Sequence, residues 1–266
     1  MRAIVVLLVV LGTAPLSAAD TSPSSSTARH LLAGVRSFKD GKYEDALVEL
    51  RVVARAPDAP ADLAFYLGPT LYKLGRYREA LAVFVSSKAA PDALTDFYLG
   101  QTYYQLKLYR KARGVFASLQ ARGLGPVLET AAASYVEAVD TAYRKPPEVV
   151  TIDSYIDTGR AALANEPTIA AEYLDEARLV EALGSAHRHD ELRGMLGAAW
   201  NATGRTTQVI EILGDGAGSA EVRWQLARAY VTSGDAAHAR PILDALVKAR
   251  GPHAEEASGV LAKLPP

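Results

Sequence analysis

The sequence predicts an all-α fold, a solenoid of antiparallel helix hairpins that follows an N-terminal signal peptide. Three observations predict it: short motifs recur at regular intervals, apolar residues inside each repeat have helical spacing, and the composition is that of a globular chain. Of 266 residues, 49% are hydrophobic, 22% are charged and none is cysteine. The missing cysteine excludes disulfide scaffolds, thiolate zinc sites and cysteine nucleophiles, and the net charge of -1 gives no reason to expect a nucleic-acid partner.

Residues 1–19 have the pattern of a secretory signal peptide. A basic start precedes the apolar run 4–11, which is too short to span a bilayer. Small residues follow it, so cleavage is expected after Ala19, with the mature chain periplasmic or secreted. An uncleaved signal anchor is the alternative. Residues 20–28 are rich in serine and threonine and predict a flexible linker.

Three hairpin units are expected within residues 29–124. Three related motifs recur in this segment, namely GKYEDAL, GRYREAL and LYRKAR. Each lies at the same distance after a glycine. These glycines are Gly34, Gly68 and Gly100, and they are 34 and 32 residues apart. A turn separates two segments of helical spacing in each unit, so each unit is a helix hairpin. The glycines allow close approach of the two helices, while Phe84 of the second unit fills the gap to the following pair.

These units resemble the tetratricopeptide repeat, a helix hairpin of about 34 residues. The resemblance implies a right-handed superhelix in which the first helix of each hairpin lines a concave groove that binds a peptide. The first unit is a looser match than the other two. The matching residues are Leu99, Gly100, Tyr103, Ala112 and Phe116 in the third unit, Leu67, Gly68, Ala80, Phe84 and Pro91 in the second, and Gly34, Ala46, Leu50 and Pro57 in the first.

The repeat pattern weakens after residue 124 and then returns. Residues 125–150 hold a lone amphipathic helix and a pair of prolines, and they are the expected boundary between two arrays. Residues 151–264 carry degenerate repeats; in the first of them Gly159 fits the pattern, but Asp175 stands where an aromatic residue is usual. The last two units match through Leu196, Gly197, Trp200, Val209 and Leu213, and through Leu226, Ala227, Tyr230, Ala239 and Leu243.

Two prolines lie inside predicted helices. Pro69 and Pro241 each remove a backbone donor, so each is expected to kink its helix. An irregular helical bundle is the alternative fold.

Several short motifs are typical of catalytic or ligand sites, but each lacks the partners that its chemistry needs. Residues 157–159 spell the Asp-Thr-Gly triplet of aspartic proteases, yet one copy occurs and a helical segment follows it. The glycine-rich stretch 214–218 lacks a preceding strand and a P-loop lysine, so a turn capped by Ser219 is expected. Residues 187–190 hold two histidines that point apart on a helix. The sequence therefore predicts no catalysis, no cofactor and no metal site.

Aromatic and amide side chains just off the core face of the first helices are the expected partner-binding residues. Tyrosines are common binding anchors because they bury a large area at small entropic cost. For the two phenylalanines, packing between neighbouring hairpins is the alternative role. The residues that the resemblance places on the groove are Phe65, Tyr72 and Lys73 in the second unit, and Phe97, Gln101, Tyr104 and Gln105 in the third.

Charge divides the chain unevenly. Residues 27–124 hold 15 Lys and Arg against 9 Asp and Glu, whereas residues 125–266 hold 13 against 20. A basic array followed by an acidic one suits an acidic protein or peptide partner, or head-to-tail self-association. Uneven charge on solvated helix faces is the alternative explanation.

The resemblance implies a non-catalytic protein–protein interaction scaffold of the bacterial cell envelope, with no nucleic-acid partner and no membrane span once the signal is cleaved. A hydrolase that uses Asp157 is one alternative function. A structural envelope spacer whose groove binds nothing is the other.

Overall fold

The computed structural model describes residues 25–87, 89–90, 92–144, 152–181, 188–214 and 216–265. Within these ranges every regular element is a helix, which confirms the all-α prediction. The predicted signal peptide, residues 1–19, lies outside the described residues. The helices are α1 (Ser25–Lys39), α2 (Tyr43–Ala54), the short 3-10 helix η1 (Ala61–Leu63), α3 (Ala64–Lys73), α4 (Tyr77–Ser86), α5 (Ala93–Gln105), α6 (Tyr109–Ala121), α7 (Pro126–Arg144), α8 (Ile152–Ala162), α9 (Pro167–Glu181), α10 (His189–Ala202), α11 (Thr206–Leu213), α12 (Ala220–Thr232), α13 (Ala236–Ala249) and α14 (Ala254–Leu261).

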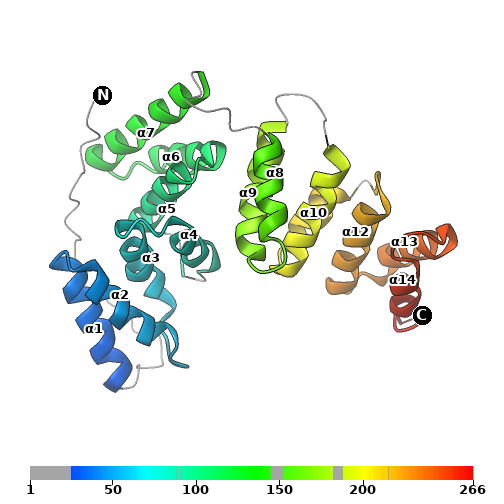
Figure 1. Cartoon of the computed structure of the whole chain (residues 1–266), viewed down its shortest axis with the longest axis horizontal. Coiled ribbons are helices and arrows are strands. Elements are labelled where there is room, and N and C mark those ends of the chain that lie inside the picture. Colours follow the sequence, from blue (N-terminus) through cyan, green and yellow to red (C-terminus); the bar gives the residue numbers. More distant parts are fainter. Residues whose placement is uncertain are drawn as a thin grey trace.

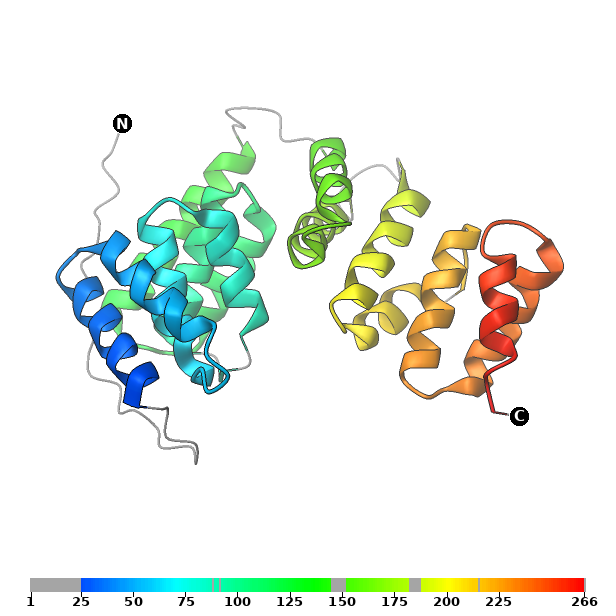
Figure 2. The same ribbon diagram turned by 60° about the horizontal axis from the view of Figure 1, so that its bottom comes forward.

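The helices form two arrays of the same plan (Figure 1). The N-terminal array consists of the hairpins α1–α2, α3–α4 and α5–α6, and the C-terminal array of α8–α9, α10–α11 and α12–α13. In each array one further helix, α7 or α14, packs on the third hairpin and closes the stack, so α7 is the single helix that the sequence predicted and it packs on the N-terminal array. Helices α1 and α14 lie at opposite ends of an elongated molecule (Figures 1 and 2).

Within a hairpin, a small residue of the first helix faces a large side chain of the second. A Cβ atom added to Gly68 would lie 2.2 Å from the Phe84 ring, and one added to Gly100 would lie 2.8 Å from the Phe116 ring. A glycine is therefore needed for the two helices to pack around these rings. The same contact recurs between Gly34 and Leu50, Gly159 and Leu174, and Gly197 and Leu213, and Ala227 and Leu243 share one buried cluster.

The fourth hairpin corrects one sequence assignment. Leu174, and not Asp175, fills the space beside Gly159, because its Cγ would lie 2.5 Å from an added Cβ. Helix α8 ends at Ala162, soon after Gly159. The large residue that packs on the glycine therefore follows it by one position fewer than in the other hairpins. Asp175 turns instead toward the N-terminal array, where it pairs with Lys111.

The recurring GKY and GRY motifs form the hairpin turns. Gly41 has a φ of 74°, a backbone conformation that glycine adopts without strain, and the next N–H, of Lys42, donates to the Ser37 carbonyl at 2.9 Å. This is a Schellman motif, and it satisfies carbonyls that the end of a helix leaves open. Gly75, Gly204 and Gly234 occupy the same position, and Lys107 takes the same left-handed conformation with a φ of 62°.

One local prediction differs from the structure. Helix α1 begins at Ser25, so the last four residues of the predicted linker, 25–28, are helical, and buried Thr27 donates a hydrogen bond to Asp58 at 2.9 Å. Pro69 and Pro241 lie inside α3 and α13 as expected, and the kinks at these prolines stay a prediction.

The two arrays meet where α9 packs against α4 and α6 (Figure 1). We call the contact residues Tyr103, Lys111, Glu172, Asp175 and Glu176 the ionic seam. Lys111 Nζ lies 2.8 Å from Glu172 Oε2 and 2.7 Å from Asp175 Oδ2. The Tyr103 hydroxyl donates to Glu172 at 2.8 Å. Glu172 and Glu176 are 1% and 0% exposed, so the arrays are joined through charges that are removed from water.

Helix α6 begins in the ionic seam. The backbone N–H groups of Arg110 and Lys111 donate to the Glu176 carboxylate at 2.7 and 3.0 Å. A carboxylate at this place satisfies free N–H groups and complements the positive end of the helix dipole. Arg205, from the turn between α10 and α11, adds a further ion pair to Glu172 at 2.8 Å.

Burial and charge act in opposite directions on the seam. Burial would raise the pKa of Glu172 and of Asp175, but Lys111, together with Arg205 at Glu172 and Arg178 at Asp175, outweighs burial and holds the pKa of both carboxyls below their ordinary values. Burial would lower the pKa of Lys111, but Tyr103 and the two carboxylates outweigh it and raise that pKa. All three groups are therefore charged at neutral pH.

Candidate functional site

Half-buried tyrosines gather on the first helices of the N-terminal array and on its closing helix. The rings of Tyr72 on α3 and Tyr98 on α5 lie 5.5 Å apart at 65°, and those of Tyr104 on α5 and Tyr135 on α7 lie 5.6 Å apart at 76°. Such edge-to-face contacts stabilise aromatic clusters. We call these four tyrosines, together with Lys73, Gln101 and Gln105, the tyrosine face.

Amide and ammonium groups lie among the rings. Gln101 Nε2 donates to the Tyr135 hydroxyl at 2.8 Å, and Gln105 lies near Tyr72, where it acts to lower the pKa of that phenol. Lys73 Nζ lies 5.9 Å from the centroid of the Tyr98 ring, within range of a cation–π contact. The tyrosine face therefore combines aromatic area with hydrogen-bonding groups.

Three phenols of this face, those of Tyr72, Tyr98 and Tyr135, stay protonated at neutral pH. Burial raises the pKa of Tyr72, Tyr98 and Tyr135 above the ordinary value, and neighbouring tyrosines raise it further. Each hydroxyl can therefore donate one hydrogen bond and accept others.

Tyr72 and Tyr104 also have a structural contact. The ring of Tyr72 lies 5.4 Å from that of Tyr77, and the ring of Tyr104 lies 5.6 Å from that of Tyr109, in each case across the hairpin turn. The first hairpin has an equivalent pair, Phe38 and Tyr43, at 5.5 Å. The tyrosine of each turn motif therefore packs on an aromatic ring five residues earlier.

The structure brings together five of the seven residues that the sequence predicted for the groove, namely Tyr72, Lys73, Gln101, Tyr104 and Gln105.

The two phenylalanines lie elsewhere. Phe97 is a core residue, 6% exposed, and its ring lies 5.6 Å from Phe116 and 5.8 Å from Tyr135, so its place in the groove was wrong. Phe65 is half-buried near the start of α3, away from Tyr72 at the end of that helix.

Sequence reasoning missed Tyr98 and Tyr135. Tyr98 precedes Gln101 and Gln105 by three and seven positions, the spacing that places residues on one face of a helix. Tyr135 follows Gln101 by 34 positions, a full repeat, but it lies in a helix that was not assigned to the array. Both signals are present in the sequence.

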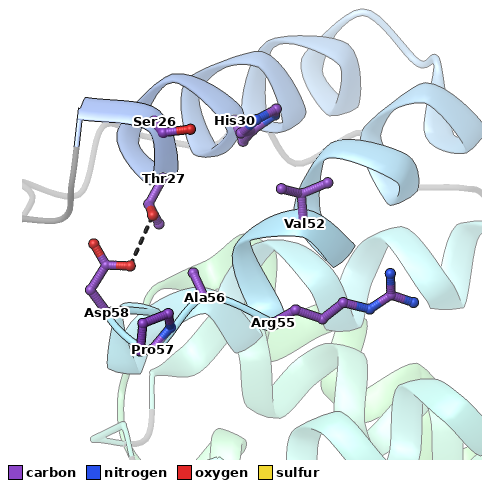
Figure 3. A pocket seen from close by; sticks show the side chains of 8 residues that line it. All are labelled: Ser26, Thr27, His30, Val52, Arg55, Ala56, Pro57 and Asp58. Atoms are coloured by element: carbon purple, nitrogen blue, oxygen red, sulfur yellow. Dashed lines mark hydrogen bonds between the residues drawn. The ribbon is translucent and has the colours of Figure 1, made fainter.

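A separate open hollow of about 510 Å³ lies at the end of the first hairpin (Figure 3). The Thr27–Asp58 hydrogen bond crosses one side of it, and His30 on the same wall lies 2.6 Å from Glu49 through its Nδ1. This hollow contains none of the residues that the sequence predicted for binding. It is lined by Ser26, Thr27, His30, Val52, Arg55, Ala56, Pro57 and Asp58.

The sequence motifs that are typical of catalytic or ligand sites make ion pairs, packing contacts or helix caps in the structure. Asp157 is exposed on α8 and pairs with Arg160 at 3.0 Å and with Arg188 at 3.3 Å, while Gly159 of the same triplet packs on Leu174. Ser219 caps α12 by accepting from a backbone N–H, as expected. His187 lies outside the described residues.

Two kinds of site are absent from the part of the chain that the structure describes. It contains no group of three or more metal-ligating side chains, and none of its helices has the length and apolar character needed to cross a membrane.

No protein-family model matches the chain, and no curated protein matches it either.

Proposed function

We propose that the chain is a non-catalytic protein–protein interaction scaffold, a tetratricopeptide-like array that binds a protein or peptide partner on its tyrosine face. The tyrosine face is the observation that carries the proposal. Four half-buried rings and two amides from α3, α5 and α7 form a surface with the composition of an interface centre, where tyrosine is enriched. The right-handed superhelix belongs to the same proposal, and the rotation between hairpins in an experimental structure tests it.

Gln105 allows this proposal to be tested with little effect on the fold, because its side chain is exposed at the end of α5. A photo-reactive amino acid placed at Gln105 in cells is expected to crosslink one discrete partner. Gln120 is the matched control: it is also an exposed glutamine, in the second helix of the same hairpin. Equal capture at both positions, or capture at neither, would contradict binding on the tyrosine face.

A double substitution then measures the contribution of the rings. Tyr72→Ala with Tyr104→Ala is expected to weaken the captured complex by about 2 kcal/mol or more, because aromatic anchors dominate interface affinity. Both rings also pack on a tyrosine of the next helix, so thermal melting of the same variant must be recorded. Unchanged affinity in a folded double variant would remove the tyrosine face from the interface.

The location in the cell envelope is part of the proposal and depends on the sequence of residues 1–19. N-terminal sequencing of protein from the envelope is expected to begin at Asp20. A chain that retains Met1 would instead be anchored through its apolar segment.

A structural spacer is the second candidate, and the ionic seam is the observation that favours it. Buried charges between the arrays hold α9 against α4 and α6, which suits a molecule that keeps a fixed length. A spacer would give no adduct at Gln105.

A further inference from the structure

One hydroxyl group of the tyrosine face is oriented by an amide beside it. Gln101 Nε2 donates to the oxygen of Tyr135 at 2.8 Å. A hydroxyl that accepts from an amide keeps its own proton for another acceptor. Tyr135 therefore presents a donor among half-buried aromatic rings.

A ligand matched to this face offers acceptors and needs few donors in return. Proline has no backbone N–H, and a polyproline II helix has no internal hydrogen bonds, so its carbonyls are free to accept. Proline rings also pack on aromatic side chains, which is how aromatic-lined surfaces recognise extended proline-rich segments.

Two other partners fit the face less well. A helical partner inserts large apolar side chains into pockets, whereas the rings of Tyr72, Tyr98, Tyr104 and Tyr135 pack edge-to-face on one another. An acidic partner needs several cations on the surface that it binds. In the described residues, the cation–π contact on this face comes from Lys73, so the face offers an acidic partner little positive charge.

We propose that the tyrosine face binds an extended, uncharged, proline-rich peptide segment, whose carbonyls accept from the Tyr135 hydroxyl and whose rings lie on the tyrosines. This inference rests on the proposed function and specifies the chemistry of its partner. The low ordering cost of a preformed polyproline helix favours binding to a surface without deep pockets.

Titration of the full chain with fluorescein-labelled decaproline, followed by fluorescence anisotropy, tests the inference. Tyr135→Phe keeps the ring but removes the donor, and it is expected to weaken binding about fivefold, the effect of one hydrogen bond. Gln105→Lys is expected to weaken binding as well, because it replaces an exposed amide of the face by an ammonium group for which an uncharged peptide has no counter-charge. The matched controls are Tyr230→Phe, a half-buried tyrosine of the C-terminal array, and Gln120→Lys on α6, and both should bind like the parent chain.

The outcomes separate the inference from the proposed function. Decaproline binding that Tyr135→Phe and Gln105→Lys leave unchanged overturns the inference. Binding of an acidic peptide that Gln105→Lys strengthens, or of an amphipathic-helix peptide that Gln105→Lys weakens, in place of decaproline also overturns it but keeps the proposed scaffold. No peptide binding together with no crosslink at Gln105 overturns both.

Discussion

The interfaces inside the arrays and the interface between them are built on different chemistry. Within a hairpin, glycine meets a large apolar side chain, as Gly68 meets Phe84, and the contact joins residues close in the chain. Between the arrays, Lys111 meets Glu172 and Asp175, which are about 60 residues away and come from another hairpin. Apolar shape thus sets the local repeat, whereas the contact between the arrays adds buried charge to an apolar cluster that continues from Leu81 and Leu108 to Tyr155 and Ile169.

The largest effect is expected from an apolar core residue. Phe116→Ala should lower the free energy of unfolding by about 4 kcal/mol, because this ring is fully buried, packs beside Gly100 and stacks on Tyr135 at 4.6 Å. Urea unfolding followed by circular dichroism measures the loss. Val127→Ala, at a position that is 61% exposed on α7, is the control and should change stability by about 0.5 kcal/mol or less. Equal losses in the two variants would contradict the packing described for the third hairpin.

The next effect concerns the ionic seam. Lys111→Met should lower the free energy of unfolding by about 3 kcal/mol, because it leaves buried carboxylates without their ammonium partner. Small-angle scattering should also show a larger radius of gyration, since the arrays are then free to separate. Arg51→Met breaks an exposed ion pair with Glu79, and it should cost at most about 1 kcal/mol. An unchanged scattering profile for Lys111→Met would show that the seam does not fix the arrays.

A smaller effect is expected from the glycine contact. Gly68→Ala should cost about 1–3 kcal/mol, because the added methyl would overlap the Phe84 ring. Gly114→Ala is the matched control: it lies in helix α6 with nothing within 4 Å of an added Cβ, so it should be neutral or stabilise the fold by about 1 kcal/mol. Thermal melting of both variants tests the pair, and a stabilised Gly68→Ala would refute the close approach of α3 and α4.

The smallest effect is expected from pH. The pKa of Glu172 and of Asp175 is lower in the folded chain than in the unfolded chain. Their stabilisation is therefore complete above the unfolded pKa of about 4 and is lost as the pH falls through the folded pKa. Unfolding midpoints measured from pH 7 down to pH 3 should fall, and they should fall less steeply in Glu172→Gln, which has one carboxyl fewer to protonate. Identical slopes would remove Glu172 from the acid response.

The hairpins could be predicted because their determinants are local. A glycine, a turn motif and a large apolar residue recur within one unit, and the helical period connects them. The ionic seam could not be predicted. Lys111 and Glu172 are not related by the repeat spacing, and nothing in the sequence distinguishes a buried charged residue from an exposed one. The assignment of Asp175 failed for a related reason: a turn of different length moved the apolar position to Leu174.

The candidate site was predicted in part. Tyr72, Tyr104 and the two glutamines were found from their place on the first helices, whereas Phe97 turned inward because α7 covers it. Tyr135 was missed because α7 lacks the glycine that marks a first helix elsewhere. A helix that closes a stack needs no such glycine, since no second helix packs against it in a hairpin.

The placement of α1 and α14 at opposite ends has a mechanical consequence (Figure 1). A pull applied between these ends loads the hairpin interfaces in series, so the weakest one yields first. Hairpin contacts are apolar and are lost together once the two helices separate by about 1 Å, because dispersion acts only at contact distance. The carboxylates and the ammonium group of Lys111 regain water when the arrays separate, so this joint is the place where the molecule would extend while both arrays stay folded.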